Sequence, residues 1–163
     1  MQRNKFWFIP LAVCALTAAN ANAESGTANA SVITPLTLTE SSTLEFGQLS
    51  SSAAAGTVVI DSADGRTATG GATLEGGTFR SGEWAVAGEA STAYTITLPS
   101  SDVTLTSGGN NMTVNTFTDD KSGSSTTDGS GDDTFKVGAT LTVGINQASG
   151  TYTGTYDVTV AYQ

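Results

Sequence analysis

Apolar and polar residues alternate along much of the chain, most strictly at its C-terminal end. Residues 150–163 read GTYTGTYDVTVAYQ. A period of two puts alternate side chains on opposite faces of a β-strand, and aromatic and β-branched residues favour strands. The pattern predicts one long strand with a mostly threonine face and an opposite face that must be buried. That second face consists of Gly150, Tyr152, Gly154, Tyr156, Val158, Val160 and Tyr162.

Shorter segments with the same alternation precede this one. The strongest is 134–144, where Phe135, Val137, Ala139, Leu141 and Val143 share one parity. Residues 102–106 and 112–118 flank Ser107–Asn111 and predict a hairpin with a longer loop. About ten short strands, frequent glycine turns and no helical period after residue 23 predict an all-β sandwich. The remaining strands are expected in 31–39, 43–47, 57–61, 67–77, 83–87 and 94–98.

Two polar stretches are expected to be loops. Residues 50–56 are small, and residues 119–134 are a low-complexity run of Ser, Thr, Gly and Asp, too polar to enter a core. The acidic side chains of the second stretch are weak candidates for a Ca²⁺ site, because their spacing does not match an EF-hand and a charged flexible loop is the commoner explanation for such residues. They are Asp119, Asp120, Asp128, Asp132 and Asp133.

The first 23 residues have the pattern of a signal peptide. Arg3 and Lys5 are followed by an apolar run over 6–18, and Ala21-Asn22-Ala23 is a small-x-small cleavage pattern. The apolar run is shorter than the roughly 20 residues of a membrane-spanning helix. We therefore expect export, a mature chain that begins at Glu24, a single domain over 24–163 and no transmembrane segment in it.

Composition narrows the function classes. Without residues 1–23 the chain keeps fifteen acidic side chains, four basic ones and no cysteine. This charge argues against nucleic acid and anionic membranes as partners. The chain has no histidine, which excludes Ser-His-Asp and Cys-His catalysis and the usual zinc sites. Acidic residues such as Glu45 and Glu83 are at strand ends with no defined separation. We expect neither an enzyme nor a bound cofactor.

Five segments together resemble the bacterial family called domain of unknown function 4402. They are VITPLTLT at 32–39, LEFG at 44–47, YTITLP at 94–99, VGATLTV at 137–143 and ASGTYTGTYDVTVAY at 148–162. The resemblance covers essentially the whole expected mature chain, and the closing motif is its most specific part. The family label implies no function.

The C-terminal end is also similar to pilins assembled by periplasmic chaperones and outer-membrane ushers. Those subunits end in an alternating strand with an early glycine and a penultimate aromatic residue, here Gly150 and Tyr162. The resemblance implies an immunoglobulin-like fold that lacks its last strand. The even-numbered face of 150–162 would then bind a partner's strand. Two departures are the missing disulfide and Pro35, which removes a ladder hydrogen bond from the expected donor strand.

The same resemblance implies a donor strand and partners. The donor would be an N-terminal arm over 24–39, with Val32, Leu36 and Leu38 as the inserting side chains. Its partners would be like subunits, a periplasmic chaperone and an outer-membrane usher. The protein would pass through the periplasm of a Gram-negative bacterium to the cell surface or the extracellular space.

Two hypotheses for function stay open at this point. The first is a fimbrial subunit that polymerises by strand exchange. The second is a free-standing secreted sandwich that binds carbohydrate or a surface, with Trp84 and the tyrosines as a platform. Trp84 shares a parity with Val86, which is more typical of a core residue. Alternation cannot separate the two hypotheses, because every long strand must bury one face.

Overall fold

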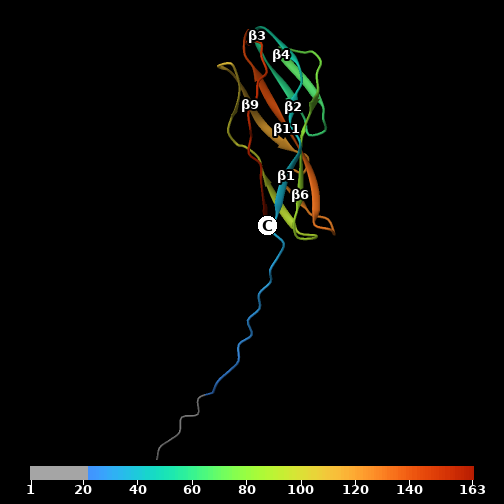
Figure 1. Cartoon of the computed structure of the whole chain (residues 1–163), viewed down its shortest axis with the longest axis vertical. Helices are drawn as coiled ribbons and strands as arrows, with labels where there is room; N and C mark the ends of the chain where they lie inside the picture. Colours follow the sequence, from blue (N-terminus) through green and yellow to red (C-terminus); the bar gives the residue numbers. More distant parts are fainter. Residues whose placement is uncertain (1–21) are drawn as a thin grey trace, which may run out of the picture. The chain divides into compact units, whose positions relative to one another are not determined.

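The computed structural model describes residues 22–163 (Figure 1). The predicted signal peptide falls almost entirely within residues 1–21 and so lies outside the described residues. Residues Ile33–Gln163 form one compact unit, and the described residues 22–32 belong to a separate one. Residues 22–32 carry no secondary structure and are exposed, and every described strand belongs to the unit Ile33–Gln163. Within residues 22–163, no helix is long and apolar enough to cross a membrane.

The described residues form twelve strands, which confirms the all-β prediction. They are β1 (Thr37–Ser42), β2 (Glu45–Phe46), β3 (Leu49–Ile60), β4 (Arg66–Leu74), β5 (Phe79–Arg80), β6 (Gly82–Ala87), β7 (Ala93–Thr97), β8 (Val103–Ser107), β9 (Asn110–Asp119), β10 (Ser124–Thr126), β11 (Asp132–Val143) and β12 (Thr159–Tyr162).

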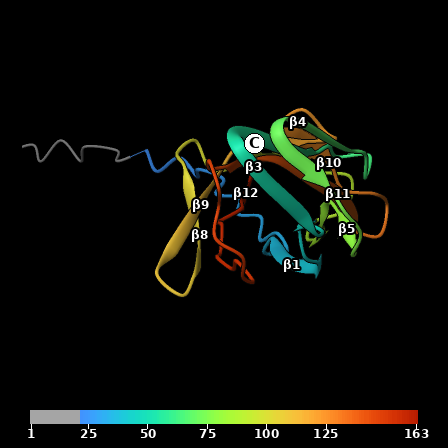
Figure 2. The ribbon, with the colours of Figure 1, turned by 90° about the horizontal axis from the view of Figure 1, so that it is seen from above.

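Strand β11 is the centre of the larger sheet, whose order is β1-β6-β11-β3-β4. The first half of β11 pairs with β6 and its second half with β3, while β9 pairs with it and carries β8. A second sheet has the order β10-β7-β12, and β2 pairs with β5. All these pairs are antiparallel, and the sheets curl into a sandwich. In Figure 2 the β8–β9 hairpin is at one side of the view and β4 and β11 are at the other.

The core follows from the alternation in β11. Its inward side chains Phe135, Val137, Ala139, Leu141 and Val143 are all buried, at 3% exposure or less. They join two apolar clusters, one around Val58, Met112 and Val114 and one around Val86, Tyr94 and Ile96. The half-buried Phe117 packs against both clusters, so the two are continuous. Each fully buried large apolar side chain stabilises the fold by roughly 1.5–3 kcal/mol.

The predicted hairpin is present, but its loop is shorter than expected. Ser107 pairs directly with Asn110, which leaves Gly108 and Gly109 as a two-residue turn. Their φ angles are 52° and 87°, the left-handed values that the turn type favoured in two-residue hairpins requires. Two adjacent glycines make this tight connection possible without steric cost.

The two polar stretches are not simple loops, so that prediction was wrong. In the first, β3 continues through 50–56 with an irregularity between Ser51 and Gly56. In the second, β10 pairs with β7, and Thr127 is only 2% exposed. The Thr127 hydroxyl accepts the Thr92 N–H at 3.0 Å and donates to the Glu89 carbonyl oxygen at 2.5 Å. A polar side chain enters the interior here because its hydrogen bonds are satisfied.

The C-terminal segment differs from the single long strand that its sequence predicts. Only β12 joins a ladder, with β7, while Thr153 forms an isolated bridge to Thr106. The burial alternates as the sequence indicates: the tyrosines and valines at even positions of 152–162 are half-buried, and the odd positions are exposed. Residues 151–158 therefore point their apolar side chains inward while most of their backbone stays outside the sheets.

A second polar contact fastens the turn before β4 to the central strand. The Asp64 carboxylate accepts hydrogen bonds from the Ser81 N–H at 2.9 Å and the Ser81 hydroxyl at 2.6 Å. It also pairs with the Lys136 ammonium on β11. Lys136, followed by the two groups of Ser81, lowers the pKa of Asp64 from 3.8 to about 2. Its charged form is therefore favoured in the folded protein.

We predict that this contact makes stability depend on acid pH. A carboxyl group with a lowered folded-state pKa stabilises the protein above pH 4, and this contribution is lost as the pH falls toward 2. The Asp64 side chain is 41% exposed, so solvent screening reduces the expected contribution to about 1 kcal/mol. Asp64→Asn should lose that amount at pH 6 in urea unfolding and much less at pH 2. The exposed Asp102→Asn is the control, and equal effects of the two substitutions at pH 6 would refute the prediction.

Candidate functional site

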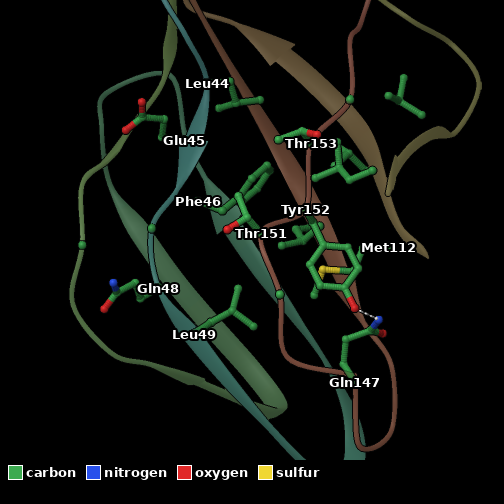
Figure 3. Close-up of a pocket in the computed structure, with 18 of the residues that line it drawn as sticks. Leu44, Glu45, Phe46, Gln48, Leu49, Met112, Gln147, Thr151, Tyr152 and Thr153 are labelled. Carbon is green, nitrogen blue, oxygen red and sulfur yellow. Dashed lines mark hydrogen bonds between the residues drawn. The ribbon is translucent and has the colours of Figure 1, made fainter. Parts of the chain in front are cut away.

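A groove of about 890 Å³ runs along the domain between residues 44–51 and residues 148–156 (Figure 3). These two extended segments are far apart in the sequence and form its two walls. Val103, Leu105, Met112, Val114, Phe117 and Leu141 also line it. Figure 3 shows side chains from both walls pointing into the space between them, with the ring of Tyr152 overlapping Met112 in this view.

The floor of the groove is the hydrophobic core itself. Met112, Val114 and Leu141 belong to the first apolar cluster, and Leu44 and Phe46 of the first wall pack against that cluster while staying partly exposed. In a complete sandwich another strand would cover such residues. Here Met112, Val114 and Leu141 are themselves 6% exposed or less, and the side chains left partly exposed along the groove are those of its walls.

The first wall has one paired edge and one unpaired edge. Strand β2 pairs only with β5, and Leu49–Ser51 at the start of β3 pair only with β4. Pairing of β3 with β11 begins at Gly56, beyond the groove. The backbone edge of residues 45–51 opposite β4 and β5 therefore makes no ladder within the described chain.

The second wall is paired even less. The Thr153 N–H and carbonyl oxygen bond to Thr106 on β8 at 3.1 and 2.9 Å. Between 150 and 158, the described structure shows no other backbone–backbone hydrogen bond. Unpaired N–H and C=O groups along an extended segment are a template for another strand. The two walls thus provide a pairing edge on either side of an apolar floor.

The glycines of the second wall allow this wall to approach β8. A Cβ atom at Gly154 would lie 2.6 Å from the Thr104 carbonyl oxygen and 2.8 Å from Leu105 Cδ2. At Gly150 the crowding atom belongs to the Ser107 side chain. The backbone that the glycines admit is therefore the protein's own β8. Gly154 also leaves a gap in the side chains of the wall between Tyr152 and Tyr156.

Aromatic side chains close one end of the groove. Tyr156 stacks on Phe117 with ring centroids 5.2 Å apart and meets Trp84 edge-to-face at 6.1 Å. The Trp84 Nε1–H donates to the Tyr156 hydroxyl at 3.4 Å, and burial raises the pKa of Tyr156. Trp84 packs against the second apolar cluster. Its ring is directed into the domain and does not form an exposed carbohydrate platform.

Polar contacts fix the other end. The Gln147 amide accepts the Gly144 N–H and donates to the Asn111 carbonyl oxygen and the Tyr152 hydroxyl, at 3.2, 3.1 and 2.8 Å. The Tyr152 hydroxyl donates in turn to the Ala148 carbonyl oxygen at 2.8 Å. This network fixes Tyr152 at the groove floor.

Arg66 holds the first wall in place through contacts with the backbone and with Phe79. Its guanidinium donates to the Gln48 carbonyl oxygen at 2.5 Å and to the Gly76 carbonyl oxygen at 3.5 Å, and it lies over the Phe79 ring at 5.3 Å. Burial lowers the pKa of Arg66. The wall opposite Tyr152 is therefore held in place before any strand occupies the groove.

Only some of the partner-binding residues predicted from the sequence lie in the groove. Gly150, Tyr152, Gly154 and Tyr156 line the groove. Val158, Val160 and Tyr162 lie outside it, and they pack against the second apolar cluster together with Leu36 and Leu38. Leu38 belongs to β1, which pairs with β6, so residues 37–39 are part of the domain in this structure. Val32 remains 97% exposed.

The family profile described as Domain of unknown function (DUF4402) matches residues 36–162. The chain belongs to the DUF4402 family. The matched residues contain both walls and the floor of the groove, and they begin after Pro35. No curated protein and no solved structure matches the chain.

Four of the five aspartates considered for calcium accept hydrogen bonds from other groups of this DUF4402 domain. Asp119 accepts the Lys121 and Gly123 N–H groups, and Asp128 accepts those of Ser130 and Asp132. Asp120 accepts the Lys136 N–H, and the Asp132 side chain is exposed. Within residues 22–163, no three acidic, histidine or cysteine side chains are grouped to hold a metal ion.

Asp133 has the most contacts of the five aspartates. It pairs with Lys121 at 3.2 Å and accepts from the Tyr94 and Ser125 hydroxyls at 2.8 and 2.5 Å. Burial tends to raise the pKa of Asp133, but these hydrogen bonds outweigh it and the pKa is lowered. The carboxylate is therefore a charged bridge between β11, β7 and β10.

Sequence reasoning missed the first wall and its support. Leu44 and Phe46 were recognised as a strand but not as one side of a binding site, and Leu49 and Arg66 were not considered. The alternation of 44-LEF-46 was a usable signal for an inward face. Nothing local in the sequence shows that the opposite edge of this wall has no partner.

We predict that Gly154→Ala destabilises the DUF4402 domain by about 1–3 kcal/mol. The added Cβ atom would meet the Thr104 backbone, so the second wall must move away from β8. Gly129→Ala is the matched control, because a Cβ atom there has no neighbour within 4 Å. Urea unfolding of both variants measures the difference, and a Gly154→Ala protein as stable as the control would show that the wall can move freely.

Proposed function

We propose that the protein is a structural subunit of an exported surface fibre, assembled by β-strand exchange. A segment of a second copy would occupy the groove and complete the sandwich. The observation that carries the proposal is the groove, where two backbone edges lack partners on either side of partly buried apolar side chains such as Leu44, Phe46 and Tyr152. Assembly of this kind needs no catalytic group and no cofactor.

An inserted strand would use both the unpaired backbone edges and the apolar surface of the groove. A strand added to a sheet edge gains main-chain hydrogen bonds, and its alternate side chains fill apolar pockets. In the groove, the inserted backbone could pair with residues 45–51 on one side and 150–156 on the other. Its inward side chains would cover the partly exposed Leu44, Phe46 and Tyr152. A globular ligand could use the apolar floor but not the two pairing edges.

The N-terminal arm, defined here as residues 24–32, has the pattern such a strand needs. Its even positions from Gly26 to Val32 are small or apolar, while Thr27, Asn29 and Ser31 at the odd positions are polar. The intervening even residues are Ala28 and Ala30. The arm's nine residues are close in number to the segments that line each wall. The donor segment we propose is therefore shorter than 24–39, because Leu36 and Leu38 pack within their own domain.

The arm would fill the groove of another copy and not its own. Nine extended residues span about 30 Å. To reach Leu44 in the same molecule, the arm would have to turn back and run along residues 34–44, which is itself roughly 30 Å. Its tip would arrive only at the entrance of the groove. Strand exchange between copies has no such limit.

Before assembly, the open groove leaves apolar side chains such as Leu44, Phe46 and Leu105 partly accessible. An exported chain in this state would aggregate unless another protein covered the groove. We therefore include a periplasmic chaperone and an outer-membrane usher in the proposal, with the cell surface as the destination. The resemblance of the C-terminal motif to chaperone–usher pilins supports this part.

We predict that a charge on the inward face of the arm blocks assembly of the chain 24–163. Ala30→Asp should weaken self-association at least tenfold, since burying an unpaired carboxylate costs well over the ~1.4 kcal/mol that tenfold represents. Asn29→Asp adds the same charge on the outward face and should assemble like the unaltered chain. Light scattering after size exclusion measures both. Equal behaviour of the two variants would contradict the proposal.

A free peptide of residues 24–32 should bind the Ala30→Asp chain, whose own arm cannot insert. We expect a higher melting temperature and a change in the fluorescence of Trp84, the only tryptophan within 24–163 and a neighbour of Tyr156 in the groove. A peptide with Ala30→Asp should do neither. If the unaltered peptide changes nothing, a monomeric secreted binding module replaces the fibre subunit as the better explanation.

A further inference from the structure

The turn at residues 144–147 displays an isoleucine at the end of the groove where Gln147 lies. Ile145 is 62% exposed. The turn is held in place: the Asn146 N–H donates to the Ser52 carbonyl oxygen at 2.8 Å, and the Ser51 hydroxyl donates to the Gln147 carbonyl oxygen at 3.2 Å. Turns favour small polar residues. A large apolar side chain at this fixed and exposed position is available to a partner outside the domain.

Residues next to the turn extend the apolar surface. The β3 irregularity at 52–55 starts at the residue that holds Asn146, and Ala53, Ala54 and Ala55 within it are all exposed. These residues and Ile145 form what we call the cap, which lies just beyond the Ser51 and Gln147 end of the groove. The cap lies outside the groove, so the proposed insertion of the arm leaves it uncovered.

A second exposed isoleucine lies at the base of the arm. Ile33 is 52% exposed and directly precedes a fixed point of the domain. The Thr34 N–H donates to Glu89 Oε2, and the Thr34 carbonyl oxygen accepts from the Tyr162 hydroxyl, both at 2.8 Å. Any molecule whose groove takes up Val32 must therefore lie next to the domain that donated the arm.

We propose that the cap of one copy packs against Ile33 of the copy whose arm fills its groove. This inference rests on the proposed strand exchange and adds a second contact to it. It also assigns the direction of insertion, with Val32 at the Gln147 end and Gly26 toward Tyr156. In the reverse direction Ile33 would emerge beside Tyr156. Among the described residues, the large exposed apolar side chains are Val32, Ile33, Phe79 and Ile145, and of these only Ile145 lies just beyond an end of the groove.

The partner is a second copy of this chain because the two surfaces match only across copies. Ile33 and Ile145 belong to one domain and lie at separate places in it: Ile33 precedes β1, and Ile145 follows β11. One copy can therefore offer its cap to the next while its own Ile33 contacts the previous one. Such a head-to-tail contact repeats without closing, as a fibre requires.

The test compares assembly of the chain 24–163 with binding of the free arm peptide 24–32, which lacks Ile33. Ile145→Asp should weaken self-association at least tenfold. Placed in the Ala30→Asp chain, it should leave the affinity for the peptide unchanged within twofold. Ala63→Asp puts the same charge on an exposed turn outside the groove and should alter neither quantity. The melting temperature of the Ile145→Asp chain checks that the fold is intact.

A pairing experiment identifies the contact. Ile33→Lys and Ile145→Asp should each weaken assembly, and a chain carrying both should recover most of the loss, because each lysine then faces an aspartate of the neighbouring copy. If the Ile145→Asp chain assembles as well as the Ala63→Asp chain, the inference is overturned, while the proposed strand exchange still stands. Loss of peptide affinity with Ile145→Asp also overturns it, since the residue would then act through the groove. A peptide that binds no variant overturns strand exchange itself.

Discussion

A β-sandwich holds together only when its apolar faces are covered and its inner edges are paired. In this DUF4402 domain, β11 meets that requirement most fully, with β6 and β3 along one edge, β9 along the other and five inward side chains buried. The curl of the sheets brings residues 44–51 and 148–156 to either side of the same core. Those two segments have no strand between them. The groove thus exists because no strand lies between these two segments, and it does not depend on any one residue.

This constraint explains how the rest of the domain is reinforced. Residues beside an incomplete part of a core need support from elsewhere, and the polar contacts gather there. Arg66 holds the first wall through backbone oxygens, and Gln147 holds the second through Tyr152. Thr153 adds one bridge to β8. The groove is therefore held open by hydrogen bonds that do not depend on an occupant.

The sequence predicted which side chains face inward but not which edges are paired. In 134–144 and 152–162, the apolar positions that the sequence predicts to face inward are the ones that the structure buries or half-buries. A period of two depends only on local backbone geometry, so it can be seen in the sequence. Whether a strand has a neighbour depends on segments far away in the chain. For that reason, 150–162 was predicted as a continuous strand although only its last residues join a ladder. The first wall was missed as part of a site for the same reason.

The polar composition of 119–134 predicted a solvent-exposed loop, and this prediction was wrong. Serine, threonine and aspartate were expected to stay in solvent, yet Thr127 is buried and Asp133 joins three hydroxyl or ammonium groups. Such residues enter an interior when partners from other strands satisfy them, and those partners cannot be seen from the stretch alone. Leu36 and Leu38 show the opposite case. They alternate like a donor strand but pack within their own core.

The penultimate tyrosine has a mechanical consequence. Its hydroxyl group accepts the Glu89 N–H and donates to Thr34, the residue that follows the base of the arm. Tension applied to the arm would therefore pass into β12 and β1 together. These strands lie in different sheets, paired with β7 and β6. A load shared between two ladders and directed along the strands must break many hydrogen bonds at once, whereas a load on one strand end could peel them apart one by one.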